Sequence, residues 1–339
     1  MDLQTVWFAA VALLWTGFLL LEGFDFGVAA LLPVLGRRPA DRHLMLRSIG
    51  PLWDGNEVWL ITAAGAVFAA FPGWYATWLP ALYLPFVLVL VGLIVRAVAF
   101  EWRHSHHTAQ WDTTWTHVIT AGSLIASLGI GAALGATTLG LPIDADGNRV
   151  GGAFAGLGWS ALLGAVAVLG FSLVHGAVFL ALKTDGPVRL AARAFARRWA
   201  PVAALPLLLW ALLVQLRSGT LATAVLLLVA ALAVLVAWAR IRVDREGQAF
   251  AAWAVVLLGS AATVFGAAYP VVVPSTIDPA FDVTIATASV SDYTLTVMTW
   301  AAGVGLPVVL AYQAWTYWVF RRRLTAEPTT EAPAEPVTA

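Results

Sequence analysis

The stretch VWFAAVALLWTGFLLLEGFDFGVAALLPV, at residues 6–34, decides the class of fold. A membrane-spanning helix needs about 20 mostly apolar residues, and this run exceeds that length with only two charged side chains, Glu22 and Asp25. The loop behind it, LGRRPADRHLMLR at residues 35–47, is rich in arginine. An apolar run followed by a basic loop predicts a helix that crosses a membrane.

The composition extends this prediction to the whole chain. Of its 339 residues, 60% are hydrophobic and only 11% are charged, and the mean hydropathy is +0.83. A soluble domain of this length needs far more charge on its surface. The sequence therefore predicts an all-α polytopic membrane protein. Its formal net charge is zero, which argues against nucleic acid as a partner.

Nine segments are long and apolar enough to be spans, within a single transmembrane domain at residues 1–323. The pair Gly23-Phe24 of the first span is echoed by Gly170-Phe171 of the fifth, and both spans precede a basic loop. This echo predicts two four-helix bundles, from repeats at 1–140 and 150–270, with one extra peripheral helix at 291–320. The nine spans are predicted near 6–34, 51–71, 77–100, 113–139, 157–182, 200–216, 220–239, 249–270 and 291–320.

Lysine and arginine predict the orientation of the chain. Of the 19 basic residues, all but Arg149 and Arg217 fall in or beside alternate connections and in the segment after the last span. Because basic loops stay in the cytoplasm, the N-terminus is predicted to lie outside and the C-terminus inside. The tail at 324–339 is rich in Pro, Thr and Glu, which predicts a disordered cytoplasmic segment.

Acidic side chains cluster at one level of the predicted bundle. The segment PLWDGNEVWLIT, at 51–62, begins the second span with Asp54 and Glu57, which are three residues apart and share a helix face. The first span carries Glu22 and Asp25 at the same spacing. With the third span included, five carboxylates and one arginine are expected to converge on the cytoplasmic half of the membrane: Glu22, Asp25, Asp54, Glu57, Glu101 and Arg96.

These residues have a structural and a functional interpretation. Asp54 can serve the helix N-terminus, Glu57 can bond first-turn amides or Arg96, and Glu101 lies so close to a loop that the structural interpretation is favoured there. Ionisable groups inside a membrane are, by default, candidates for ion or proton pathways. Asp25 and Asp54 are therefore the strongest candidates for a functional role.

The residue inventory gives no redox centre in this chain. Cysteine is absent, which excludes iron–sulfur clusters, thiolate-ligated haem and c-type haem attachment. His175 is the single histidine well inside a predicted span, and it is expected to form a hydrogen bond between helices. No metal ligand set is predicted.

The motifs GFDFGV at 23–28 and GPLWDGNEVWL at 50–60, together with Arg96 and Glu101, resemble subunit II of cytochrome bd-type quinol oxidases. The resemblance implies a subunit of a terminal oxidase in the bacterial cytoplasmic membrane, which oxidises quinol, reduces dioxygen to water and contributes to the proton-motive force without pumping. It implies a homologous partner, subunit I, that carries haems b and d. Subunit II itself would ligate no haem.

The resemblance also implies roles for particular residues. Protons for the oxygen chemistry would come from the cytoplasm, with Asp25 and Asp54 on the path and Glu22, Asn56 and Glu57 supporting them. Trp53, Trp59, Arg96 and Glu101 would pack or pair nearby. Some members hold a structural quinone in this subunit, and a small single-span subunit is a further expected partner beside membrane lipid.

Two alternatives stay open. A proton-coupled secondary transporter would also contain buried acids, but it would work as an isolated chain with a substrate site near the midplane. In a purely structural subunit the acidic cluster would only fix helix packing, so amide replacements would damage assembly more than turnover.

Overall fold

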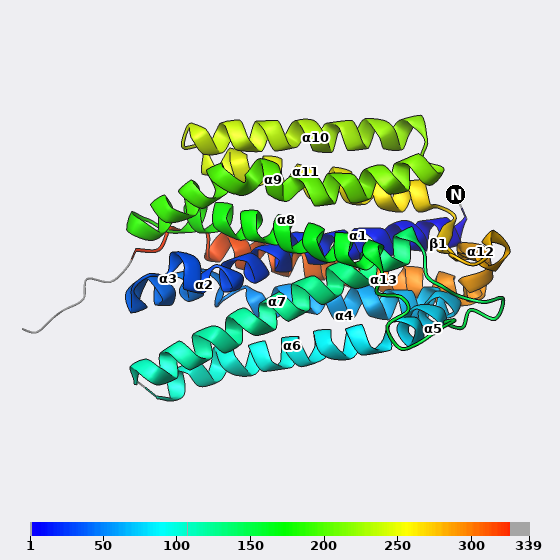
Figure 1. The fold of residues 1–339 in the computed structure, drawn as a ribbon, viewed down its shortest axis with the longest axis horizontal. Helices are drawn as coiled ribbons and strands as arrows, with labels where there is room; N and C mark the ends of the chain where they lie inside the picture. Colours follow the sequence, from blue (N-terminus) through cyan, green and yellow to red (C-terminus); the bar gives the residue numbers. More distant parts are fainter. Residues whose placement is uncertain (1, 107, 326–339) are drawn as a thin grey trace, which may run out of the picture.

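The computed structural model describes residues 2–106 and 108–325, and its long helices run side by side in one elongated bundle (Figure 1). Eight of the described helices are long and apolar enough to cross a membrane, so the prediction of an all-α polytopic fold is confirmed. They are α1 (Leu3–Ala30), α6 (Tyr83–Trp102), α7 (Ala109–Leu139), α8 (Trp159–Lys183), α9 (Gly186–Ser218), α10 (Leu221–Arg242), α11 (Glu246–Ala268) and α13 (Asp292–Val319).

The remaining predicted span corresponds to α4 (Trp53–Ala70), which lies within the same bundle (Figure 1). Its 18 residues begin with Asp54, Asn56 and Glu57 in the first turn and a half, so α4 contains no 18-residue stretch as apolar as those of the eight helices above. The count of nine spans therefore stays a prediction. A helix with this composition is poorly suited to contact lipid on every side.

Two predicted spans end elsewhere in the structure. The segment predicted at 77–100 is divided into α5 (Pro72–Ala81) and α6, because Leu82 leaves the helical conformation between them. The span predicted at 200–216 is the second part of the longer α9. The span was predicted to begin too late because the arginines in the first part of α9 lower the hydropathy there. The structure shows that this first part and the predicted span form one continuous helix.

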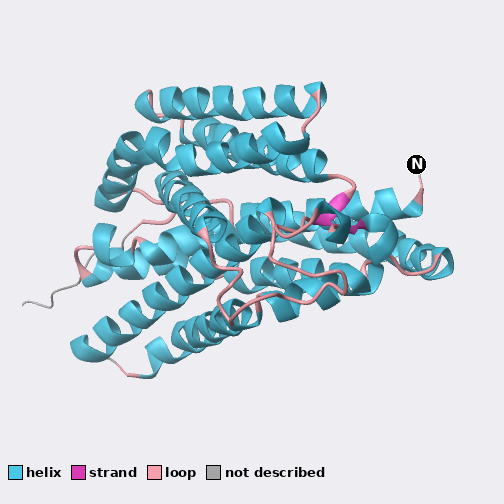
Figure 2. Cartoon of the chain, turned by 45° about the vertical axis from the view of Figure 1, so that its right-hand side comes forward, coloured by secondary structure: helices cyan, strands magenta, loops and turns pink. Residues whose placement is uncertain are grey.

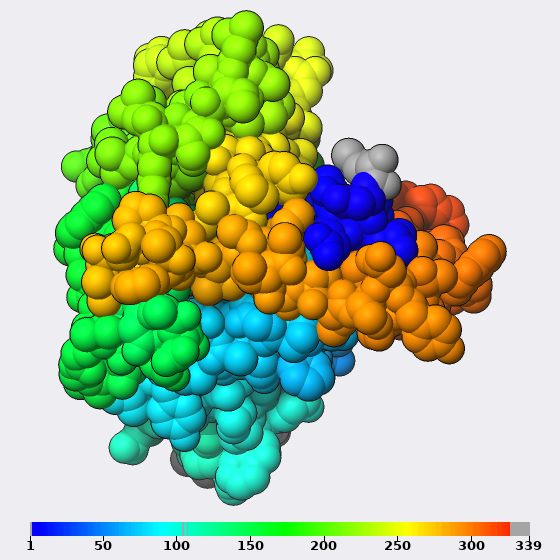
Figure 3. Space-filling view, turned by 90° about the vertical axis from the view of Figure 1, so that its right-hand side faces the viewer, coloured from blue at the N-terminus to red at the C-terminus, as the bar shows by residue number. Residues whose placement is uncertain are grey.

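Short elements close the two ends of the bundle. The end with the basic loops carries α2 (Leu32–Leu35), α3 (Pro39–Ile49) and the 3-10 turn η1 (Arg103–Ser105). At the other end are β1 (Val271–Val273), η2 (Pro279–Phe281), β2 (Val283–Thr284) and α12 (Ile285–Ala288), and the two strands pair antiparallel (Figure 2). Figure 3 shows this second end, where the segment containing the strands lies across the helix ends.

The centre of the bundle is the contact between α1 and α8. A Cβ atom placed on Gly27 would overlap the backbone of Ser172 and Gly176, so only glycine permits this approach. Beside it, the rings of Phe24 and Phe179 stack with centroids 4.1 Å apart. The two glycine-containing motifs of the sequence thus face each other, while the repeats themselves stay a prediction.

Helix α13 is attached to the rest of the chain through few buried side chains. Among its described residues, Leu295 alone is buried. After α13 the chain turns back to α8, where the backbone N–H of Leu324 donates to the carbonyl oxygen of Lys183 at 2.8 Å. The predicted disordered tail therefore cannot begin at Leu324, which is held by backbone bonds. Residues 326–339 of that tail lie outside the described residues.

Candidate functional site

A buried ion pair joins α1 to α6 near the end of the bundle with the basic loops. The last part of α1 is enclosed on all sides, so Glu22 and Asp25, one turn apart, are both fully buried. Arg96 of α6 is also fully buried, and its Nη1 forms an ion pair with Oε1 of Glu22. A buried pair of this kind is a candidate functional element because charges are costly to remove from water.

A second carboxylate reaches the same guanidinium from α4. Oε2 of Glu57 lies 3.5 Å from Nη1 of Arg96, and the Glu57 side chain keeps 20% of its surface exposed. Glu57 is therefore the partly accessible member of the group, whereas Glu22 is enclosed. One arginine thus holds acidic side chains from two helices.

Aromatic rings enclose the guanidinium of Arg96. Its Cζ lies 5.0 Å from the ring centroid of Phe26, 5.3 Å from that of Phe100 and 5.9 Å from that of Trp53. The rings of Trp53 and Phe100 stack with centroids 4.9 Å apart. These faces attract the cation and exclude water from it, which strengthens its interaction with the carboxylates.

Asp25 is connected to the other helices through Asn56 of α4. Nδ2 of Asn56 donates to Oδ2 of Asp25 at 2.7 Å, and Asn56 is fully buried. Oδ1 of Asn56 accepts hydrogen bonds of 2.9 Å from both Nε2 of Gln313 and the hydroxyl of Tyr317. Four helices, α1, α4, α6 and α13, therefore contribute to one polar cluster, called the Arg96 cluster below: Glu22, Asp25, Asn56, Glu57, Arg96, Gln313 and Tyr317.

The structure brings together only part of the predicted acidic group. Asp54 and Glu101 are exposed, and among the described residues neither takes part in a hydrogen bond or ion pair with the cluster. Asp54 and Glu101 therefore lie outside the hydrogen-bonded group, and the predicted convergence of all five carboxylates on the cytoplasmic half stays a prediction. Trp53 packs beside Arg96 as expected, and Trp59 packs on α1, where a Cβ on Gly17 would lie 2.7 Å from its ring.

Gln313 and Tyr317 are members of the cluster that the sequence reasoning missed. They are four residues apart, so they share one face of α13, and they are polar side chains within an apolar helix. The sequence therefore allows the prediction that this face of α13 makes a polar contact. It does not indicate that the partner is Asn56, because α13 follows α4 by more than 200 positions in the chain.

His175 has the role expected for a lone histidine inside a span. Its Nε2 lies 3.0 Å from the carbonyl oxygen of Leu20, which links α8 to α1. The ring is fully buried and stacks on Phe250 with centroids 4.6 Å apart. This packing does not fit a haem plane at His175. Among the described residues, no group of three or more His, Cys, Asp or Glu side chains is arranged to hold a metal ion.

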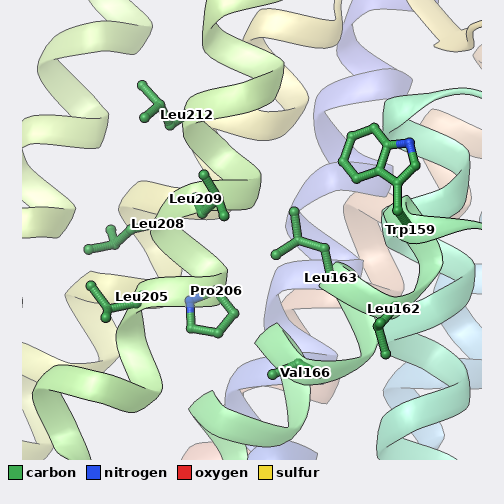
Figure 4. A pocket seen from close by; sticks show the side chains of 9 residues that line it. All are labelled: Trp159, Leu162, Leu163, Val166, Leu205, Pro206, Leu208, Leu209 and Leu212. Atoms are coloured by element: carbon green, nitrogen blue, oxygen red, sulfur yellow. The ribbon is translucent and has the colours of Figure 1, made fainter.

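An apolar groove lies apart from the Arg96 cluster, between α8 and α9 (Figure 4). Its volume is about 680 Å³. Its lining is apolar except for the indole N–H of Trp159, so it fits a hydrocarbon chain better than a polar ring. The lining residues are Trp159, Leu162, Leu163, Val166, Leu205, Pro206, Leu208, Leu209 and Leu212.

A bundle of membrane-length helices with an acid-rich cluster buried near its basic end defines a polytopic membrane protein with a buried ion-pair cluster. The family model described as cytochrome bd terminal oxidase subunit II matches residues 3–320. The chain belongs to this family. It is therefore a subunit of an oxidoreductase complex and a multi-pass protein of the bacterial cytoplasmic membrane.

Individual relatives agree with the family match. The chain is 38% identical to cytochrome bd ubiquinol oxidase subunit 2 of Bacillus subtilis (strain 168), over 97% of this chain and 99% of the relative. It is 33% identical to cytochrome bd-I ubiquinol oxidase subunit 2 of Escherichia coli (strain K12), over 96% of each chain.

A solved structure has the same fold. A chain in the structure of bd oxidase from Geobacillus thermodenitrificans superposes with a TM-score of 0.77. The match covers 94% of this chain and 99% of that chain, at 19% sequence identity. At this identity the similarity supports the fold alone.

Proposed function

We propose that this chain is the haem-free subunit II of a quinol-oxidising terminal oxidase, and that its Arg96 cluster takes part in proton uptake from the cytoplasm. The names of the relatives support a ubiquinol-oxidising complex, and the sequence resemblance supports a subunit I that carries haems b and d. Those haems would supply the reduction of dioxygen. The residues of this chain would bind and deliver protons.

The basic residues support the proposed orientation. Arg96 lies near the end of α6 that leads to Arg103, and this end of the bundle carries the arginine-rich α3 and the first part of α9. Because such loops stay in the cytoplasm, the cluster would lie in the cytoplasmic half. The N-terminus would then face the outside and the C-terminus the cytoplasm.

The charge balance of the cluster is the single observation that carries the proposal. Three carboxyl groups, those of Glu22, Asp25 and Glu57, lie around one guanidinium in the interior. If all three were ionised, the group would hold two uncompensated negative charges, and burying such charges is strongly unfavourable. One or two of the carboxyl groups are therefore expected to carry protons that can be exchanged.

The exposure of the three acids gives the path a direction. Glu57 is partly exposed and is suited to accept a proton from the water side, whereas Glu22 and Asp25 are fully buried. Arg96 contacts Glu22 and Glu57 at once, so it can stabilise whichever of the two is ionised. Asp54, exposed one turn before Glu57, stays in the proposal as the first group that protons meet.

A bound quinone in this chain is not part of the proposal. The groove between α8 and α9 offers a single indole N–H among its lining side chains and lies away from the cluster. The chain's contribution to quinol chemistry is therefore placed in its support of subunit I. A small single-span subunit, predicted from the resemblance, has no assigned surface here.

The proposal is tested with Asp25→Asn in the complex co-expressed with subunit I. The measurements are the reduced-minus-oxidised haem spectrum and quinol-driven oxygen uptake between about pH 5 and 9. We expect the haem bands to persist and oxygen uptake to fall at least about tenfold, because a positioned proton-transfer group contributes at least that much. Glu101→Gln, at an exposed position near the same level, is the matched control and should keep its activity.

Two results would contradict the proposal. Unchanged uptake with an unchanged pH profile in Asp25→Asn would exclude a role in proton delivery. Loss of the haem bands, with normal turnover per remaining haem, would favour the purely structural subunit instead.

A further inference from the structure

The amide of Asn56 is held by four hydrogen bonds whose directions are all determined. Its Oδ1 accepts from Nε2 of Gln313 and from the hydroxyl of Tyr317, both at 2.9 Å. Its Nδ2 donates to Oδ2 of Asp25 at 2.7 Å and to the carbonyl oxygen of Leu21 at 3.3 Å. All the hydrogen-bonding capacity of a buried amide is therefore used.

These bonds fix which end of the Asn56 amide faces Asp25. The oxygen and nitrogen of an amide are assigned from its partners, and here the deciding partner is the carbonyl oxygen of Leu21, which can only accept. In the reversed orientation, Oδ1 would face the carbonyl oxygen of Leu21, which is also an acceptor. Nδ2 would then face the two groups from α13 that now donate. Asn56 therefore presents its Nδ2–H donor, not its oxygen, to Asp25.

The two carboxylate oxygens of Asp25 differ as a result. Oδ2 accepts the bond from Asn56, whereas Oδ1 is buried and receives no N–H donor, and Glu22 is the acid with which Asp25 can share a proton. A donor at Oδ2 favours the ionised carboxylate and leaves Oδ1 as the atom that can take up a proton. The orientation of Asn56 therefore controls how readily Asp25 is protonated.

We infer that Gln313 and Tyr317 are positioning residues that lock Asn56 with its N–H toward Asp25, so that α13 controls proton uptake at Oδ1 of Asp25. The inference rests on the proposed proton path. Neither side chain touches Asp25 itself; each acts through Asn56. Each bond adds its own restraint on rotation of the amide, so the loss of one bond loosens Asn56 and the loss of both releases it.

A simpler interpretation is that these bonds only fasten α13 to the bundle. Because Leu295 is its one buried residue among those described, α13 has little apolar packing to hold it. A second polar contact, from Nε1 of Trp7 to Oγ1 of Thr299 at 3.0 Å, already fastens the opposite end of the helix. A fastening role would affect assembly and total activity, whereas a positioning role would change the pH profile.

Other charged or titratable groups around Asp25 could shift the pH profile themselves, so the test must leave them unchanged. They are Glu22 on α1, Glu57 on α4, Arg96 on α6 and Tyr317 on α13. Helix α8 adds His175, which is bonded to Leu20. Only Tyr317 is changed in the variants below, and a tyrosine hydroxyl is neutral across the working range.

The experiment compares Gln313→Leu/Tyr317→Phe with the unchanged complex containing subunit I. Quinol-driven oxygen uptake is measured as a function of pH, and carboxyl C=O stretching is followed by infrared difference spectroscopy. Without donors from α13, only the 3.3 Å bond to the carbonyl oxygen of Leu21 still holds the Asn56 amide in place beside Asp25. Asn56 can then turn its oxygen toward Asp25 more often, and in that orientation it favours the protonated acid. We expect the midpoint of the pH profile to rise by about one unit, a tenfold change in proton affinity, together with a larger protonated-carboxyl band.

Single variants and a control make every outcome decisive. Tyr317→Phe and Gln313→Leu each leave one donor, so each should give a smaller shift in the same direction, and they decide the matter if the double variant does not assemble. Tyr312→Phe removes an exposed hydroxyl from the same helix and should leave the profile unchanged.

Two failures are distinguishable. A lower rate with an unmoved profile in the double and single variants would overturn the inference and favour fastening. If Asp25→Asn itself had no effect, the proposed proton path would fall, and this inference with it. If Asp25→Asn lost activity but the α13 variants did not shift the profile, only this inference would fall.

Discussion

Two ion clusters in this protein contain the same kinds of side chain in different surroundings. The Arg96 cluster lies inside the bundle, where Arg96 and Glu22 have no exposed side-chain surface. The second cluster, called the interfacial cluster, joins α9 and its N-cap, the turn between α10 and α11, the start of α11 and the segment after α13 at the basic end, and its arginines are 21–35% exposed. It comprises Asp185, Arg189, Arg193, Asp244, Glu246 and Arg323.

The two clusters differ in charge balance as well as in exposure. The interfacial cluster has three arginines and three carboxylates, with contacts such as Arg189 Nη2 to Glu246 Oε1 at 2.7 Å and Arg323 Nη1 to Asp185 Oδ1 at 3.1 Å. The Arg96 cluster has one arginine and three carboxyl groups. A balanced, hydrated cluster can fasten helices without exchanging protons, whereas an unbalanced, buried one is stable only if some of its acids are protonated. Charge balance, more than residue type, therefore distinguishes an ion cluster that only holds helices together from one that can exchange protons.

The largest expected effect is that of Arg96→Met. This substitution replaces the cation by an unbranched apolar side chain and leaves Glu22 buried without its partner. The free energy of unfolding should fall by about 3–5 kcal/mol as a result. We expect almost no assembled complex, measured as the haem content that co-purifies with this chain. Arg193→Met in the interfacial cluster is the matched control and should assemble. Normal yield and thermal stability for Arg96→Met would show that Glu22 does not depend on Arg96.

The second effect is a partial rescue of that variant. Adding Glu22→Gln to Arg96→Met removes the buried charge that lost its partner, so the double variant should be more stable than Arg96→Met alone. The coupling should be about 1–3 kcal/mol, within the range for residues in direct contact. Because the Arg96→Met complex is not expected to assemble, the coupling is measured from the thermal unfolding of this chain in detergent, and the rescue is checked as recovery of the haem content that co-purifies with it. Purely additive losses would contradict a direct pair.

The third effect should be smaller, because the interfacial cluster has spare partners. In Glu246→Gln, Arg189 and Arg193 keep Asp185 and Asp244, so the loss of stability should be about 1 kcal/mol or less. The Glu246 side chain is only 6% exposed, whereas the arginines that pair with it are 21–35% exposed. Increasing the salt concentration should therefore shrink this difference in part, because the exposed arginine charges are screened. Thermal unfolding at low and high ionic strength gives the measurement. A salt-independent loss of several kcal/mol would mean that this cluster is effectively buried.

The smallest effect concerns a pair in the loop outside the spans. The side-chain bond from Arg38 holds the pKa of Asp41 below its usual value of 3.8, and Asp41 also accepts the backbone N–H of Arg38 at the start of α3, at 3.2 Å. Because the folded pKa is lowered, the stabilisation is present above the unfolded pKa and is lost as pH falls through the folded value.

The measurement for this pair is amide hydrogen exchange in α3 as the pH is lowered from about 5 to 3. We expect a local destabilisation of about 0.5 kcal/mol, as is typical of a charge at a helix N-terminus. Asp41→Asn should show faster exchange at pH 5 and no further change attributable to this pair. An α3 that responds to pH equally in both proteins would exclude the role of Asp41.

The depth of each polar residue in the membrane could be predicted from the sequence. The direction in which its side chain points around the helix axis could not. A helix rises about 1.5 Å per residue, so the sequence correctly placed Glu22, Asp25 and Glu57 at the level of Arg96. Asp54 and Glu57 lie three residues apart, yet Glu57 reaches Arg96 and Asp54 is exposed. The rotation of α4 about its axis decides this, and contacts such as Trp59 on Gly17 set that rotation.

The sequence by itself determined the class of fold, the approximate spans, the basic end and the family resemblance. These depend on hydropathy, charge and short motifs, all of which are local in the chain. The tertiary structure alone decided that Arg96 bridges Glu22 and Glu57, and that Gln313 and Tyr317 of α13 complete the environment of Asp25. These contacts depend on which helices are neighbours and how each is rotated. Close packing, such as that of Gly27 against α8, fixes those relations between residues far apart in the chain.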